Sequence, residues 1–162
     1  MGLFTFVKNA GEKLFGKKGA QAAPTPAKAD PAAANRAAAD AILAYIKTQN
    51  LETIGITITF DGASGTVKVV GSVPDQETKE KIILCCGNVE GVEDVEEEIL
   101  VEQVEPEAEF YTVEKGDNLS KISKMHYGDP NKYMAIFEAN KPMLKHPDKI
   151  YPGQMLRIPR LE

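Results

Sequence analysis

Histidine and cysteine, the common ligands of transition metals, are scarce in this sequence, with two of each. Its 162 residues include two histidines, His126 and His146, and neither has a Cys, Asp or Glu at metal-ligand spacing. We therefore expect surface or half-buried roles for both. Ser120 and Ser123 have no histidine base at usable spacing, so nucleophilic catalysis has no support. We predict that the protein is not an enzyme.

Long apolar runs are also missing. No stretch approaches the roughly 20 apolar residues of a membrane-spanning helix. Residues 1–10 make a poor secretory signal, because their apolar run is short and no positive segment precedes it. Cys85 and Cys86 are adjacent in a predicted helix, where their side chains point apart, which fits core thiols in a reducing compartment. We expect a cytoplasmic protein without stable membrane insertion.

Positive charge is not in excess. The net charge of −5 argues against a nucleic-acid partner, because non-specific binding to phosphates needs clustered cationic side chains. Between Glu90 and Glu109 every ionisable residue is acidic. This run indicates a solvated strand face followed by a linker, with attraction between domains as the alternative. We expect a monomer, and the sequence identifies no downstream protein partner.

The first 32 residues differ in composition from the rest. Residues 1–15 carry a dense apolar face, which predicts a short amphipathic helix that ends near Gly11. We expect this helix to pack on the following domain rather than on a membrane, because its few lysines supply little charge. Residues 16–32 are rich in Ala, Pro, Lys and Gly, and their prolines forbid a continuous helix. This segment is predicted to be a tether.

Residues 33–103 predict an αββαβ domain. An alanine-rich helix runs to about residue 48, residues 56–60 and 66–71 alternate as a β-hairpin, a helix then ends at Gly87, and a third strand covers residues 92–101. Residues 65–73 and 81–95, with paired glycines around Asn88, resemble the BON domain. The resemblance implies a binding module without catalytic positions, in some members associated with membranes and osmotic stress.

Residues 104–109 are predicted to be an acidic linker, and residues 110–160 predict the order strand, helix, helix, strand. Asn118 can cap the first helix, and residues 155–159 alternate as the closing strand. Residues 111–123, Asn140 and residues 150–159 resemble the LysM domain. That resemblance implies a βααβ fold with both helices on one face of a two-stranded antiparallel sheet, and often a groove for N-acetylglucosamine polymers. The predicted fold class is α+β.

The order of these segments resembles one narrow group, the bacterial cytoplasmic potassium-binding proteins in which a BON domain is followed by a LysM domain. Residues 1–4 and 136–145 also match this group, whereas the Ala/Pro-rich tether departs from it. The resemblance implies selective binding of K⁺ by a sensor or buffer whose two domains close together on the ion. Potassium is therefore the expected ligand.

A potassium site would leave no side-chain motif in the sequence. Selective sites surround this ion mainly with neutral backbone carbonyls. A helix leaves its last four C=O groups unpaired, and two predicted helices end at glycine, near Gly11 and Gly87. We predict that the ion is held by the backbone carbonyls of Val7, Ala10, Glu12, Gly87, Val89 and Val92.

Two other functions stay open. One is an envelope protein that binds peptidoglycan through a LysM-like groove formed by Gly116, Asp117, Asn118, Leu119, Ile150, Tyr151, Pro152 and Gly153. The poor export signal argues against it. The other is a structural stress protein with no ligand, for which no cation would change the thermal stability.

Overall fold

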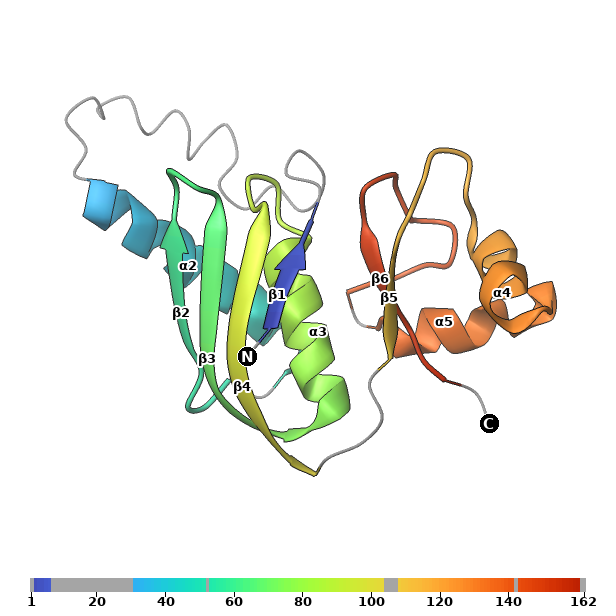
Figure 1. Cartoon of the computed structure of the whole chain (residues 1–162), viewed down its shortest axis with the longest axis horizontal. Helices are drawn as coiled ribbons and strands as arrows, with labels where there is room; N and C mark the ends of the chain where they lie inside the picture. The colour runs from blue at the N-terminus through green and yellow to red at the C-terminus, as the bar shows by residue number, and fades with distance from the viewer. Residues whose placement is uncertain (1, 7–30, 52, 104–107, 142, 161–162) are drawn as a thin grey trace.

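The computed structural model describes residues 2–6, 31–51, 53–103, 108–141 and 143–160. Two domains lie next to each other along the long axis of the molecule (Figure 1). The first contains β1 (Gly2–Thr5), α2 (Pro31–Thr48), β2 (Thr57–Asp61), β3 (Thr66–Asp75), α3 (Gln76–Gly87) and β4 (Asp94–Gln103). The second contains β5 (Glu109–Thr112), α4 (Leu119–Tyr127), the 3₁₀ turn η2 (Pro130–Lys132), α5 (Tyr133–Ala139) and β6 (Met155–Ile158). These elements confirm the predicted α+β class.

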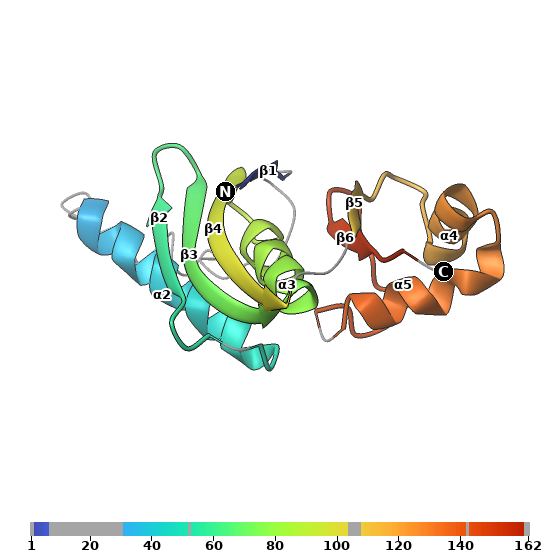
Figure 2. The same cartoon turned by 60° about the horizontal axis from the view of Figure 1, so that its bottom comes forward.

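The first domain is built on a four-stranded sheet in the order β1-β4-β3-β2. β2 and β3 form the predicted antiparallel hairpin, and α3 connects β3 to the parallel strand β4. Alternate residues of β3 and β4 are buried, because α2 and α3 pack on one face of the sheet (Figure 2). The core joins both helices to the inward residues of the strands: Ile42, Ile46, Val67, Val69, Ile82, Ile83, Val95 and Ile99.

The N-terminal segment differs from the prediction of a helix. Gly2–Thr5 forms strand β1, which pairs antiparallel with β4 and places Phe4 opposite Val95. The edge of β4 offers backbone partners to this segment, whereas a helix of a few residues is marginal. A short apolar run does not distinguish a strand from a helix. Residues 7–15 of the predicted helix and residues 16–30 of the predicted tether lie outside the described residues.

The second domain has the predicted order of strand, helix, helix and strand. β5 pairs antiparallel with β6, with Tyr111 opposite Leu156. Asn118 caps α4, because its side chain accepts a hydrogen bond from the N–H of Lys121 at 2.8 Å. The second helix, expected from residue 131, begins as the turn η2 and continues as α5. The core of the second domain contains Val113, Leu119, Ile122, Ile136, Phe137, Leu144, Leu156 and Ile158.

The two domains touch through β1 and α3 of the first and β5 and β6 of the second. The rings of Phe4 and Phe110 pack with their centroids 5.3 Å apart. Met155 of β6 is buried among the core residues of the first domain. In both views β5 and β6 lie between α3 and α4 (Figures 1 and 2). In the described part of the chain, no helix has both the length and the apolar character needed to cross a membrane.

Candidate functional site

The chain turns sharply at the end of α3, and residues 87–92, from the last residue of the helix onward, are called the 87–92 loop below. The N–H of Val92 donates to the carbonyl of Val89 at 3.0 Å. Gly91 lies in this turn with a φ of 104°, a conformation that glycine adopts without a steric penalty. Val89 and Val92 are both 0% exposed. Gly87, Asn88, Val89 and Val92 are buried, whereas Glu90 and Gly91 at the tip of the turn are partly exposed.

Three of the predicted potassium ligands, Gly87, Val89 and Val92, belong to the 87–92 loop. The carbonyl of Val89 keeps a second lone pair after it accepts the N–H of Val92. The other three predicted ligands lie outside the described residues: Val7, Ala10 and Glu12. The fold thus gathers half of the predicted carbonyls on one buried turn.

The N-terminal segment reaches the 87–92 loop at Phe6, the residue before the predicted ligand Val7. Phe6 is 5% exposed, and its N–H donates to the carbonyl of Glu93 at 2.7 Å. Its ring lies so close to Gly87 that a Cβ atom there would overlap the ring. The sequence indicated Gly87 only as a helix end. Close packing against Phe6 is a second reason for glycine at this position.

Asn88 joins the 87–92 loop to the second domain. Its Nδ2 donates to the carbonyl of Met155 at 2.7 Å, and its Oδ1 accepts from the N–H of Met155 at 2.8 Å. Asn88 and Met155 are 3% and 9% exposed. The carboxamide pairs with one residue of β6 much as a neighbouring strand would. Sequence reasoning missed this role, because the partner is 67 residues away.

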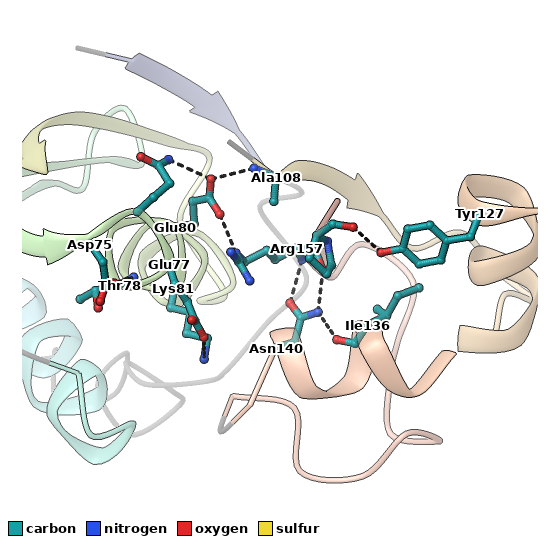
Figure 3. Close-up of polar contacts among 12 residues, drawn as sticks. Asp75, Glu77, Thr78, Glu80, Lys81, Ala108, Tyr127, Ile136, Asn140 and Arg157 are labelled. Carbon is teal, nitrogen blue, oxygen red and sulfur yellow. Dashed lines mark hydrogen bonds and ion pairs between the residues drawn. The ribbon is translucent and has the colours of Figure 1, made fainter. Parts of the chain in front are cut away.

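Asn140 makes the same double contact two residues further along β6. The N–H of Arg157 donates to Asn140 Oδ1 at 2.7 Å. Asn140 Nδ2 donates to the carbonyl of Arg157 at 2.9 Å and to that of Ile136 at 2.7 Å (Figure 3). Asn140 belongs to the second domain itself, whereas Asn88 belongs to the first. Two carboxamides, one from each domain, therefore bind alternate residues of β6.

A buried ion pair lies beside these asparagines. Glu80 of α3 is 3% exposed, and its Oε1 accepts a hydrogen bond from Arg157 Nε at 2.5 Å. Its Oε2 accepts from Gln76 Nε2 at 2.8 Å and from the N–H of Ala108 at 2.9 Å (Figure 3). Both oxygens of this carboxylate are therefore satisfied by the protein.

A pocket of about 300 Å³ opens between β1, α3 and β5. On its wall, Lys79 Nζ lies 3.3 Å from Oε2 of Glu97, which is 3% exposed. Among the residues that the structure describes, no group of three or more His, Cys, Asp or Glu side chains could hold a metal ion.

The cysteines and histidines have the surroundings that the sequence predicted. Cys85 and Cys86 are reduced thiols buried in the core. Burial, followed by the neighbouring Cys85, raises the pKa of Cys86 well above its usual value, so this thiol stays protonated at neutral pH. His126 is half-buried with Nδ1 3.4 Å from Glu109 Oε1, and His146 is exposed.

One half of the predicted glycan groove serves the structure of the second domain. Asp117 Oδ2 accepts from the hydroxyl of Tyr111 at 2.5 Å and from the N–H of Glu114 at 2.9 Å. These two hydrogen bonds hold the pKa of Asp117 below its usual value. Burial, with the bond to Asp117, raises the pKa of Tyr111 to about 12. Gly116 is exposed in the same turn, with a φ of 90°.

An open pocket of about 520 Å³ lies near this turn, lined by Asn118, Leu119, Ser120, Tyr133, His146, Pro147 and Asp148. This lining does not include the other predicted half of the groove: Ile150, Tyr151, Pro152 and Gly153. The N–H of Gly153 donates instead to the carbonyl of Val113 at 2.8 Å, which extends the pairing of β5 with β6. Of the predicted groove residues, Asn118 and Leu119 belong to this lining.

Known proteins share this arrangement of domains. The BON domain family matches residues 34–103, and the LysM domain family matches residues 111–159. The potassium binding protein Kbp of Escherichia coli is 43% identical over 160 residues, which cover 98% of this chain and 99% of Kbp. This chain belongs to the Kbp family. An uncharacterized protein of Deinococcus radiodurans is 51% identical over 49 residues, or 30% of this chain and 19% of that protein.

Membership of the Kbp family confirms the resemblance inferred from the sequence. The two domains occur in the predicted order, BON first and LysM second. The identity to Kbp extends over nearly the whole chain, so it includes more than the two domains alone. The alignment with Kbp therefore also covers the N-terminal segment, which packs on the 87–92 loop through Phe6.

Proposed function

We propose that this member of the Kbp family binds K⁺ selectively and acts in the cytoplasm as a potassium sensor or buffer. The observation that carries the proposal is the position of the 87–92 loop, which contacts both the N-terminal segment and the second domain. Gly87 packs on Phe6 of the N-terminal segment, and Asn88 bonds to Met155 of the second domain. Kbp, which is 43% identical, is named as a potassium binding protein, and that name supports the choice of ion.

The proposed ligands are the carbonyls of Gly87, Val89 and Val92, with those of Val7, Ala10 and Glu12. Neutral carbonyl oxygens can replace the water shell of K⁺, as they do in potassium channels. The described buried carboxylates of Glu80 and Glu97 are already paired with Arg157 and Lys79. A divalent cation, which prefers several carboxylate ligands, would find little to bind in such a site.

Ion binding is also proposed to draw the two domains together. A ligand shifts a conformational equilibrium only by its different affinities for the two states. The 87–92 loop is fixed by Phe6 on one side and by Met155 on the other when the domains are docked. Its carbonyls are then held in one arrangement, so the docked state is the one that should bind K⁺ better.

Isothermal titration calorimetry of the full chain tests ion binding directly. KCl and NaCl are compared at an ionic strength held constant with choline chloride. We expect a saturable heat with K⁺ and little heat with Na⁺. Equal responses to the two salts would overturn the proposed selectivity, and no response to either would overturn ion binding.

A truncated chain tests the contribution of the N-terminal segment. Deleting residues 1–15 removes Phe6 and three proposed ligands, so the K⁺ response should disappear while the LysM domain stays folded. A full K⁺ response in this variant would show that the N-terminal segment supplies no essential ligand.

A further inference from the structure

We infer that Asn88 is the positioning residue that transmits potassium occupancy from the 87–92 loop to the LysM domain. The inference rests on the proposed function, because it assigns a readout to the same loop. Asn88 lies between Gly87 and Val89, two of the proposed ligands. Its side chain leaves the loop and ends on the backbone of Met155 in the other domain.

The backbone of Asn88 is fixed by the fold of the loop. Its N–H donates to the carbonyl of Leu84 at 2.8 Å, at the end of α3. The peptide groups on either side carry the carbonyls of Gly87 and of Asn88 itself. An ion that orients the neighbouring carbonyls therefore also orients the Cα–Cβ bond from which the carboxamide extends. Potassium binding at the loop and the direction of the Asn88 side chain are thus coupled through the backbone of Asn88 itself.

The contact on the other side is demanding in geometry. Asn88 must present its oxygen to the N–H of Met155 and its nitrogen to the carbonyl of the same residue, at 2.8 Å and 2.7 Å. Both residues are buried, so a carboxamide displaced from this position would leave polar backbone groups without water or partner. The two bonds together should favour docking by about 25-fold, since each contributes roughly fivefold.

Asn140 provides an internal comparison. It forms the same pair of bonds to Arg157 of β6, at 2.7 Å and 2.9 Å, but it starts from the LysM domain. The Asn140 contact is therefore kept when the domains separate, whereas the Asn88 contact is lost. Within β6, Arg157 is therefore bound by an asparagine of its own domain, whereas Met155 is bound by Asn88 only when the two domains dock.

Thermodynamic reciprocity follows from this arrangement. If K⁺ strengthens docking through Asn88, docking must strengthen K⁺ binding by the same factor. A variant that loses the Asn88 side chain should keep the carbonyl ligands and still bind K⁺. Its affinity should fall by at most about 25-fold, the coupling that the two lost bonds can supply.

The test compares the wild type with Asn88→Ala and Asn140→Ala by two measurements on the same samples. Calorimetry measures K⁺ binding, and small-angle X-ray scattering measures the radius of gyration with K⁺ and with Na⁺ at equal ionic strength. We expect Asn88→Ala to bind K⁺ up to about 25-fold more weakly, and to lose the K⁺-dependent decrease in radius of gyration. We expect Asn140→Ala to lower the melting temperature of the LysM domain but to keep that decrease.

Each outcome decides a different point. If Asn88→Ala contracts with K⁺ as the wild type does, Asn88 does not transmit occupancy, although potassium binding stands. If the wild type shows no K⁺ heat, the proposed function fails and the inference fails with it. Should Asn88→Ala not fold, Asn88→Asp keeps the side-chain shape and the acceptor for the Met155 N–H but loses the donor. Full contraction of Asn88→Asp would overturn the inference, and reduced contraction would support it.

Discussion

Glu80 and Arg157 form an ion pair between the two domains, with Arg157 Nε 2.5 Å from Glu80 Oε1 (Figure 3). The two side chains are 4% and 13% exposed, so water and salt screen the pair little. The pair joins α3 to β6, and Asn88, directly after α3, binds Met155 of the same strand. The docked arrangement therefore combines a charged contact and a neutral one along one strand.

Removing one partner of this ion pair should be strongly destabilising. Glu80→Ala leaves the Arg157 guanidinium without its carboxylate and leaves Gln76 and the Ala108 N–H without their acceptor. We expect the free energy of unfolding, measured by urea denaturation, to fall by about 3–5 kcal/mol. The exposed pair of Lys68 and Glu98, 3.6 Å apart, is the control, and Lys68→Ala should cost less than about 1 kcal/mol.

Replacing both partners separates the value of the pair from the cost of an unpaired charge. Well-packed apolar residues often substitute for a buried ion pair with little loss. The double variant Glu80→Leu, Arg157→Leu should therefore be more stable than Glu80→Ala. A double variant less stable than the single one would contradict this explanation.

The packing of Gly87 against Phe6 makes a second prediction. A methyl group at position 87 would overlap the Phe6 ring, so Gly87→Ala should displace β1 and cost about 1–3 kcal/mol. Phe6→Leu opens space for that methyl group, and the double variant should be more stable than the sum of the single effects predicts. Thermal denaturation measures all three variants. Simple additivity would show that the two positions are not in contact.

The turn that carries Asp117 should make stability depend on pH in two ranges. The hydrogen bonds from Tyr111 and Glu114 lower the pKa of Asp117 in the folded state, so its stabilisation is present above the unfolded pKa and is lost as pH falls through the folded one. Tyr111 behaves in the opposite sense. Its folded pKa is raised to about 12, so its stabilisation is present below the unfolded value and is lost as pH rises through about 12.

Melting temperatures of the wild type and Asp117→Asn between pH 7 and pH 2 measure the acid limb. The variant should melt lower at neutral pH, and the difference should shrink below the ordinary carboxyl pKa of about 3.9. A difference that stays constant over this range would mean that Asp117 does not stabilise the turn through its charge.

Local signals in the sequence predicted most of the fold. Alternation over residues 56–60 and 66–71 predicted the hairpin, and Asn118 caps α4 as its side chain suggested. The prediction of a helix was wrong for Gly2–Thr5, which forms strand β1. Its partner β4 begins at Asp94, and nothing within the first residues signals that edge. Periodicity over so short a segment fits a helix equally well.

The contacts around the candidate site were beyond sequence reasoning for the same physical reason. Asn88 and Glu80 lie on α3 or directly after it, but their partners on β6 are 67 and 77 residues away. A single asparagine or glutamate in a helix is usually solvated, so neither residue type pointed to a contact between domains. The backbone-carbonyl hypothesis came from helix ends and stays a prediction, although Gly87, Val89 and Val92 do share one buried turn.

Carbonyl chemical shifts test the central claim most directly, because they report on the atoms proposed to hold the ion. The measurement is a ¹³C-detected titration of the labelled full chain with KCl, compared with NaCl at equal ionic strength. Saturable K⁺-specific shifts are predicted at the proposed ligands, Val7, Ala10, Glu12, Gly87, Val89 and Val92. Shifts of equal size with Na⁺, or K⁺-specific shifts that leave Gly87, Val89 and Val92 unchanged, would contradict a potassium site in this loop.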